Sequence, residues 1–367
     1  MTQIAQAPAE RSAAATPSSP AARPESTPPA ERPPVNDYAD LKRRIKAAGL
    51  LEKQPFYYAV NILFVLSLLG LNIAVLVLVE SLWIQLFNAV LLAFVFTQIS
   101  FLGHDATHRQ IFRSTRNNDI AGTVFWNVLL GMSNRWFIYR HTRHHARPNE
   151  LDGDPDADLI ILSLSETQAR RRQGPLRFFV RYQVLLLPFL SLEMIVLHYA
   201  SYRFLVQRLA KYPAIEPLLT LVSIAAFVAL PYYFLGFWPA LLFVLVNQVF
   251  FGVYFVSVIA ANHKGMPFWE QKGPLDFLRQ QVVTARNVKS NPLIDFWYGG
   301  LNFQIEHHLF PNMPRNKLRD AQVIVRRFCE ERGIPYCETG LVQSFRDILE
   351  ALRAVSAAEA EAIRRAA

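Results

Sequence analysis

The chain has 367 residues, of which 52% are hydrophobic and only 18% are charged, whereas an ordinary globular domain has roughly 25% charged residues. This composition excludes an intrinsically disordered or a collagen-like protein. Two cysteines, Cys329 and Cys337, cannot hold together a chain of this length, so a disulfide scaffold is also excluded. The net charge of +9 in an apolar chain favours contact with anionic lipid headgroups over nucleic acid.

The N-terminal residues 1–36 contain eight of the 23 prolines and almost no large apolar side chains. Such a segment cannot bury enough apolar surface to offset the entropy lost on ordering, so we expect a disordered tail. It also lacks the apolar core of a secretory signal peptide.

Two long stretches, 54–108 and 212–263, contain no Lys or Arg. Each is long enough for two membrane crossings of about 20 residues. The predicted transmembrane helices lie near residues 57–79, 83–103, 217–235 and 239–260. Because the short connections within each pair carry no basic residue, the positive-inside rule predicts that both termini are cytoplasmic.

The remaining segments are expected to lie at the membrane surface or above it. The apolar run 182–200 carries Pro188 and is flanked by arginines, so we interpret it as an interfacial helix. Residues 264–367 are charged, with helical periodicity at 316–332 and 341–366. We therefore predict an all-α integral membrane fold, in which four transmembrane helices and interfacial helices lie under a cytosolic helical cap.

Eight of the nine histidines fall into four groups at the ends of predicted transmembrane helices or in predicted cytosolic segments. They are His104 and His108; His141, His144 and His145; His263; and His307 and His308. Residues three and four positions apart share one helix face, so each multiple group directs its imidazoles to one side. Gln304 precedes His307 and His308 at the spacing of the second group. Two crossings separate His108 from His263, so all eight can meet on the cytoplasmic side.

Eight imidazoles exceed the four ligands of one zinc ion and suit two metal ions. Imidazole binds Fe, Cu, Zn and Ni, so the ligand type does not name the metal. The absence of a His-Glu-x-x-His sequence argues against a zinc protease. His198 stands alone, and we expect a structural role for it.

Over roughly residues 40–340 the chain resembles the membrane fatty acid desaturase family. The shared motifs are GHDATH at 103–108, HTRHH at 141–145, NHKGMP at 262–267 and QIEHHLFP at 304–311. The Gln that opens the last motif resembles front-end and related acyl-lipid and acyl-CoA desaturases. The resemblance implies a dinuclear iron site where four spanning helices meet a cytosolic cap. We therefore expect a membrane desaturase domain over 37–340, and the helical periodicity of the remaining residues predicts a C-terminal helix at 341–367.

Carried over residue by residue, the resemblance implies that all eight grouped histidines bind the two iron ions. Four further residues are expected to support these ligands through hydrogen bonds: Gln304, Asp105, Asn262 and Glu306. Gln304 stands where many relatives have His, and we do not assign it to the metal. Asn149, Asp154 and Asp156 follow the second motif and either form a turn around Pro155 or belong to the site.

The resemblance implies that an acyl chain is oxidised with O2 and two electrons from an external donor. The chain has no His-Pro-Gly-Gly haem motif, so we expect a separate donor of the ferredoxin or cytochrome b5 type. Arg135, Arg140 and Arg143 suit an acidic donor and suit lipid headgroups equally well. The expected substrate is a fatty acyl-CoA or membrane acyl lipid of about C16–C18.

Two other functions remain open at this point. A lipid or carotenoid hydroxylase or ketolase would use the same metal site and also begin with hydrogen abstraction from an unactivated C–H bond. A non-redox metal-binding membrane protein or transporter is the remote alternative, because transporters place their ligands near the bilayer midplane.

Overall fold

The computed structural model describes residues 36–157, 162–186, 193–208, 215–271 and 273–366. The chain divides into residues 1–36 and the unit 37–367, and the account below concerns the second unit. Except for Asn36, the predicted disordered tail lies outside the described residues.

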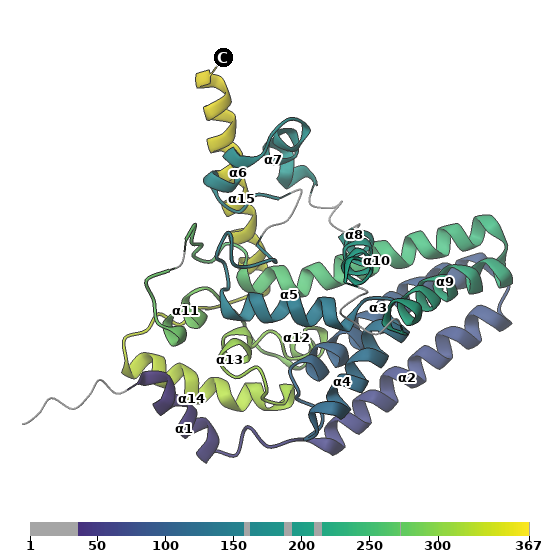
Figure 1. The fold of residues 1–367 in the computed structure, drawn as a ribbon, viewed down its shortest axis with the longest axis horizontal. Coiled ribbons are helices and arrows are strands. Elements are labelled where there is room, and N and C mark those ends of the chain that lie inside the picture. The colour runs from purple at the N-terminus through teal and green to yellow at the C-terminus, as the bar shows by residue number, and fades with distance from the viewer. Residues whose placement is uncertain (1–35, 158–161, 187–192, 209–214, 272, 367) are drawn as a thin grey trace, which may run out of the picture. The chain divides into compact units, whose positions relative to one another are not determined.

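Within the described residues, four helices are long and apolar enough to cross a membrane, as the sequence predicts. They are α2 (Pro55–Leu78), α3 (Leu82–Thr107), α9 (Ile215–Leu235) and α10 (Phe237–His263). Short connections join α2 to α3 and α9 to α10, and Gly236 makes the second turn with a φ of 76°. Helix α3 packs against both α2 and α10, and α9 packs against α10 (Figure 1).

Two of the spanning helices run beyond their predicted ends. Helix α3 continues past residue 103 to Thr107, and α10 continues past residue 260 to His263. The helical hydrogen bond from His108 N to His104 O is 3.0 Å long. The first and third histidine groups therefore lie on, or directly after, the last turns of spanning helices. We call this end of the helices the site side.

Among the described residues outside the spanning helices, nearly all of the regular structure is also helical, which confirms the predicted all-α membrane fold. Its elements are α1 (Asp37–Ala47), α4 (Thr115–Thr123), the π-helix η1 (Val124–Leu129), α5 (Asn134–Ala146), α6 (Glu166–Arg171), α7 (Pro175–Leu186), α8 (Glu193–Gln207), α11 (Phe277–Val283), α12 (Pro292–Trp297), α13 (Gln304–Leu309), the 3-10 helix η3 (Arg315–Lys317), α14 (Leu318–Glu331) and α15 (Leu341–Ala366). The strands β1 (Asn287–Val288) and β2 (Glu338–Thr339) form one short parallel pair.

The described parts of the apolar run 182–200 lie in α7 and α8. Helix α7 ends at Leu186 and α8 begins at Glu193, and Tyr182 has a non-helical backbone conformation. Pro188 and its neighbours in 187–192 lie outside the described residues.

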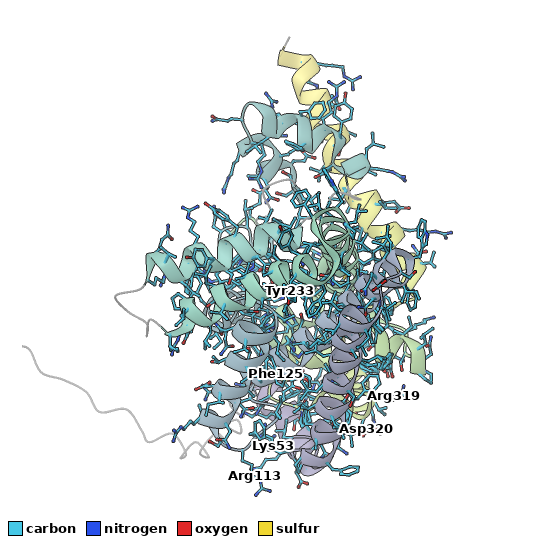
Figure 2. All side chains as sticks on the ribbon, turned by 90° about the vertical axis from the view of Figure 1, so that its right-hand side faces the viewer. Lys53, Arg113, Phe125, Tyr233, Arg319 and Asp320 are labelled. Atoms are coloured by element: carbon cyan, nitrogen blue, oxygen red, sulfur yellow. The ribbon has the colours of Figure 1, made fainter. Side chains whose placement is uncertain are left out.

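Viewed from the side of the short connections, Tyr233 near the end of α9 faces the reader, and the basic Lys53 and Arg113 lie at the periphery (Figure 2).

Separate apolar clusters stabilise the spanning helices and the cap, by which we mean α1 together with the described residues after α10. One cluster joins α2, α3, η1 and α10, and a second joins α1, α11, α13 and α14. A third connects Phe101 and Tyr254 of the spanning helices to Val288 and Tyr298 of the cap. The cap is therefore attached to the site side through side-chain packing.

The buried guanidinium of Arg286 ties the end of α10 to α15. Arg286 Nε donates to Ala261 O at 2.9 Å, and its Nη1 donates to Asp347 Oδ2 at 2.6 Å. A third guanidinium nitrogen donates to Lys264 O. These bonds fix the residues on both sides of His263.

We predict that Arg286→Met lowers the thermal unfolding midpoint of the detergent-solubilised protein. The substitution leaves buried carbonyl groups without donors, which costs about 1–3 kcal/mol. Arg346→Met, at an exposed arginine of α15, is the matched control and should change the midpoint little. Equal midpoints for the two variants would contradict the stabilising role of Arg286.

Candidate metal centre

The structure brings the eight grouped histidines into two adjoining sets. In each set, one ring nitrogen of every member lies within 4.8 Å of those of the other members. The five-histidine set comprises His104, His108, His141, His145 and His307. The three-histidine set comprises His144, His263 and His308. The rings of His145 and His308 stack with centroids 4.3 Å apart, so the sets touch.

Hydrogen bonding cannot account for the contacts inside the five-histidine set. His145 Nε2 lies 3.1 Å from His141 Nε2 and 3.2 Å from His307 Nε2. His307 Nε2 also lies 3.2 Å from His104 Nε2. A neutral ring nitrogen carries either one proton or one lone pair, so it makes only one hydrogen bond. Nitrogen ligands about 2 Å from a shared cation stand about 3 Å apart, so the set fits a metal ion.

A further observation supports this fit. His108 Nε2 is buried and has no hydrogen-bond partner among the described residues. Burial also lowers the pKa of His108 to about 3 and holds the pKa values of His141, His145 and His307 well below the usual range. These imidazoles are therefore neutral near pH 7, and neutral imidazole is the form that binds a metal.

In the three-histidine set, hydrogen bonds at the outer ring nitrogens fix the ring orientations. His263 Nδ1 lies 3.0 Å from Thr284 O, and His308 Nδ1 lies 2.8 Å from Gln281 Oε1. Both oxygens are acceptors, so the proton is on Nδ1 in each ring. The two Nε2 lone pairs then face each other at 3.0 Å. They repel each other unless a cation lies beside both.

His144 differs from the other ligands because a carboxylate lies behind it. Its Nδ1 is 3.0 Å from both oxygens of Asp154, and Asp154 is buried. Burial alone would lower the pKa of His144, but the charge and hydrogen bond of Asp154 outweigh burial and raise it. Asp154 therefore stabilises positive charge on this imidazole, whether a proton or a metal ion supplies that charge. Asp154 also accepts from Asn149 N at 2.9 Å.

A glycine allows close packing beside the first motif. A Cβ at Gly103 would lie 2.7 Å from Nε1 of Trp126, so no other residue fits there without movement. Trp126 belongs to the π-helix η1 and stacks on Phe137 with ring centroids 4.2 Å apart. Phe137 in turn stacks on His141 at 4.8 Å. This aromatic stack supports the face of α5 that carries the second motif.

The four residues predicted to support the ligands have different surroundings. Gln304 Nε2 lies 2.9 Å from His263 Nε2, and Asn262 Nδ2 donates to Gln304 Oε1 at 3.1 Å. Asp105 Oδ1 lies 3.3 Å from His104 Nδ1. Glu306 lies further from the imidazoles.

The carboxylate of Glu306 has its hydrogen-bond partners in the residues around β1 and β2. It accepts from Asn287 Nδ2 and from Tyr336 OH, each at 2.7 Å. Burial raises the pKa of Glu306 to about 7. The two neighbours therefore hold Glu306 in the packing between β1 and the segment before β2.

The sequence analysis did not identify three groups that hold the ligands or their neighbours in place. Arg315 Nε lies 3.2 Å from Asp105 Oδ2, and both side chains are buried. The carbonyl of Thr284 and the amide of Gln281 hold ring nitrogens, as described above. No spacing signal marks a backbone carbonyl or a single Arg or Gln, and only the folded structure shows their positions.

His198 joins neither set, as the sequence analysis expected. Its Nδ1 lies 2.7 Å from Met194 O, and its Nε2 lies 2.9 Å from Leu130 O. The ring therefore connects α8 to the end of η1. Among the described residues it belongs to no group of candidate metal ligands.

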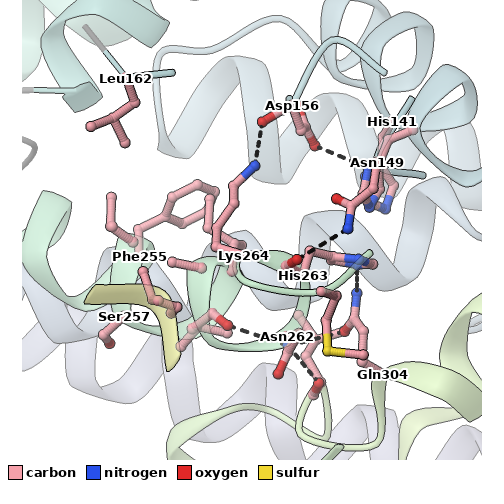
Figure 3. A pocket seen from close by; sticks show the side chains of 18 of the residues that line it. His141, Asn149, Asp156, Leu162, Phe255, Ser257, Asn262, His263, Lys264 and Gln304 are labelled. Carbon is pink, nitrogen blue, oxygen red and sulfur yellow. Dashed lines mark hydrogen bonds and ion pairs between the residues drawn. The ribbon is translucent and has the colours of Figure 1, made fainter. Parts of the chain in front are cut away.

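An apolar cavity of about 540 Å³ adjoins the histidines. Members of both sets line it, together with Gln304, and Figure 3 shows His141 and His263 facing the space across from Phe255 and Leu162. Apolar side chains of α10 and α15 form much of the remaining wall. Arg140 and Lys264 also reach the wall, where Lys264 Nζ donates to Asp156 O at 2.7 Å.

The fold and the histidine sets define an integral membrane protein with a candidate metal centre at the site side. A family model described as fatty acid desaturase matches residues 81–340. An acyl-lipid (9-3)-desaturase of Physcomitrium patens is 28% identical over 341 residues, which cover 89% of this chain and 64% of the relative. A delta(8)-fatty-acid desaturase of Euglena gracilis is 30% identical over 318 residues, covering 82% and 74%. A delta(6)-fatty-acid desaturase of Caenorhabditis elegans is 28% identical over 326 residues, covering 83% and 72%.

The chain belongs to the fatty acid desaturase family and is by class an oxidoreductase. It spans 64% of the length of the moss relative and 72–74% of the other two. Membership implies an iron cofactor, a fatty acyl substrate and O2. The histidine sets fit such a cofactor, because their ring nitrogens converge at ligand spacing.

We predict that His144→Ala and His307→Ala each reduce the iron bound by purified protein, whereas His198→Ala does not. Removing a ligand imidazole from either set removes a bond and leaves the remaining ligands misplaced, while the membrane fold survives on helix packing. Iron content per chain is the measurement, and retention in detergent of a monodisperse protein is the control for folding. Wild-type iron content in His144→Ala would contradict the assignment of the three-histidine set.

Proposed function

We propose that this chain introduces a C=C double bond into a fatty acyl chain at a dinuclear non-haem iron site. The five-histidine set binds one iron ion and the three-histidine set binds the other, with His144 held by Asp154. The observation that carries the proposal is the direct contact between the histidine sets and one apolar cavity. A metal centre that opens into an apolar cavity suits the oxidation of an alkyl chain.

The reaction removes two hydrogens from adjacent methylene carbons and reduces O2 to two water molecules. Two electrons and two protons complete the balance. Bound iron would supply O2 activation. The protein residues place the substrate: the apolar wall excludes water from the methylene groups and holds one methylene pair beside the imidazoles. A misplacement of about 1 Å can cost roughly 100-fold in rate, so this wall determines which carbons react.

The proposed substrate is a fatty acyl-CoA or a membrane acyl lipid of about C16–C18, the length that suits a leaflet of a bilayer with about 30 Å of hydrocarbon. Arg140 and Lys264 lie on the cavity wall beside Asp156, which both contact, and they are the basic residues nearest to a head group bound there. Arg279 pairs with Asp37 and Asp276, and Arg286 pairs with Asp347.

A separate protein of the ferredoxin or cytochrome b5 type is the proposed electron donor. Of the three arginines near the second motif, Arg135 pairs with Glu216, and Arg140 pairs with Asp156 at 2.5 Å. Arg143 is exposed and donates to Tyr139 OH at 2.9 Å. The outer face of α5, opposite its histidines, is therefore the part of this basic region that an acidic donor could reach.

A lipid or carotenoid hydroxylase or ketolase on the same iron scaffold is the second candidate. Both reactions begin with hydrogen abstraction, and they differ in whether a second hydrogen leaves or oxygen is added. The QIEHHLFP motif and the names of the relatives favour desaturation. A metal transporter is disfavoured because the histidines lie at the ends of the spanning helices and not at midplane.

Expression in a host that lacks similar enzymes tests the reaction. We expect new monounsaturated or more highly unsaturated acyl chains, and mass spectrometry after derivatisation of the alkenes locates the new bond. His307→Ala, expressed to the same level, is the inactive control. Hydroxylated lipids without any new alkene would transfer the assignment to the second candidate.

We also propose that both termini and the histidine sets are cytoplasmic, because the connections α2–α3 and α9–α10 carry no Lys or Arg. A membrane-impermeant thiol reagent should label Trp238→Cys in intact cells, since this residue lies beside the second connection and is 71% exposed. Arg113→Cys, exposed on the site side, should react only after permeabilisation. The opposite pattern would reverse the orientation.

A further inference from the structure

The short helix α12 (Pro292–Trp297) presents an apolar face that is partly exposed. Leu293 is 70% exposed, Phe296 is 47% exposed and Trp297 is 39% exposed. Positions i, i+3 and i+4 share one side of a helix, so the three side chains form one patch. Exposed aromatic and aliphatic side chains that gather on one face mark an interaction surface.

The patch is continuous with the side chains of three spanning helices. The ring of Phe296 lies 6.4 Å from that of Phe64 on α2 and 5.9 Å from that of Phe94 on α3. The ring of Trp297 stacks on Tyr254 of α10 at 3.9 Å. Phe64 is itself 42% exposed, so the apolar surface of α12 extends the lipid-facing surface of α2.

These contacts place α12 well below the site-side ends of the spanning helices. Phe64 follows Pro55, the first residue of α2, by nine positions, and Tyr254 precedes His263 by nine positions. At 1.5 Å per residue, each lies about 13 Å from the end of its helix. The hydrocarbon of a bilayer is about 30 Å thick, so the neighbours of α12 lie at hydrocarbon depth.

The polar groups of α12 itself have partners within the protein, which lowers the cost of burying them in hydrocarbon. The one carboxylate of α12, Asp295, accepts from Ser290 Oγ at 3.0 Å and from Asn302 Nδ2 at 2.8 Å, and it pairs with Arg319. At the first turn, Asn291 Oδ1 accepts from Ile294 N at 2.9 Å.

The end of α12 is satisfied in the same way. Tyr254 OH donates to Trp297 O at 2.7 Å. The backbone nitrogens of Tyr298, Gly299 and Gly300 donate to carbonyls of α12. The carboxylate and the terminal backbone groups of α12 therefore have partners within the protein, while its apolar side chains are exposed.

We infer that α12 is inserted into the site-side leaflet of the bilayer, where Leu293, Phe296 and Trp297 contact lipid acyl chains. The segment enters from the cap and returns to it, as a short re-entrant helix. This inference departs from the sequence analysis, which placed all of 264–367 in a cytosolic cap. Six residues are too few for a hydropathy window to detect.

The insertion also explains how the last histidine motif is held. Gly299 and Gly300 turn the chain from α12 to α13 with φ values of 56° and 85°. A Cβ at Gly299 would lie 2.5 Å from the ring of Phe101 on α3. The chain between α12 and the motif that begins at Gln304 therefore packs closely against α3. Insertion of α12 into the bilayer would in this way also set the depth of that motif.

Nitroxide labels on the full chain in phosphatidylcholine–phosphatidylglycerol vesicles test the inference. Leu293→Cys is compared with Leu63→Cys on α2, 68% exposed, and with Val323→Cys on α14, 70% exposed, in a chain whose native cysteines are replaced by Ala. Electron paramagnetic resonance measures collisions with O2, which concentrates in hydrocarbon, and with a water-soluble nickel chelate. We expect Leu293 to match Leu63, with O2 favoured over nickel. A Leu293 label that matches Val323 overturns the inference.

A second measurement does not depend on labelling. Lipids brominated on their acyl chains quench tryptophan fluorescence at hydrocarbon depth. We expect Trp297→Phe, which keeps an apolar ring, to remove part of the quenching seen in the unmodified chain. Trp269→Phe, in the cap, should remove none. Equal quenching in the unmodified chain and in Trp297→Phe would also overturn the inference.

Discussion

Eight imidazoles whose ring nitrogens converge are the constraint on which this structure depends. Without a cation between them, nitrogens such as those of His263 and His308, 3.0 Å apart, repel each other. The fold must supply that proximity from α3, α5, α10 and α13, which are far apart in the sequence. The packing and hydrogen bonds described above hold these four segments together at the site side of the spanning helices.

The surroundings hold each ring from its outer side. A carboxylate behind His144, a carbonyl behind His263 and an amide oxygen behind His308 each accept from Nδ1 and direct Nε2 inward. The amide of Gln281 is itself oriented, because its Nε2 donates to His145 O at 3.0 Å. Groups that fix a ring in this way preserve the arrangement of lone pairs, and losing one typically weakens metal binding 10- to 100-fold.

Much of this arrangement was predictable because it follows from spacing. Apolar runs without Lys or Arg locate the four spanning helices, and intervals of three and four residues group the histidines. The same rule explains Glu306: it is adjacent in sequence to His307, but it is not three or four positions from Gln304, so it points to another side of α13. The predicted ends of α3 and α10 lie before the observed ends. The final turns of both helices contain polar residues, which the hydropathy pattern does not assign to a spanning helix.

Other features depend on contacts between distant segments. The ion pair between Asp105 and Arg315 joins residues 210 positions apart, and Arg315 also donates to Tyr57 OH at 3.1 Å and to Asn61 Oδ1 at 3.3 Å. A single arginine in a basic chain carries no sign of such a role. The depth of α12 likewise follows from its neighbours on three helices and not from its own six residues.

The two histidine sets differ in their access to solvent. Three members of the five-histidine set, His108, His141 and His145, are partly exposed, whereas His144, His263 and His308 are all buried. A ligand that is partly exposed can be displaced by water or by a chelator before its neighbours move. An ion in the five-histidine set would therefore exchange sooner than its neighbour, and a partly depleted protein would retain the ion of the buried set. The fold thus gives the two histidine sets different access to water and to chelators.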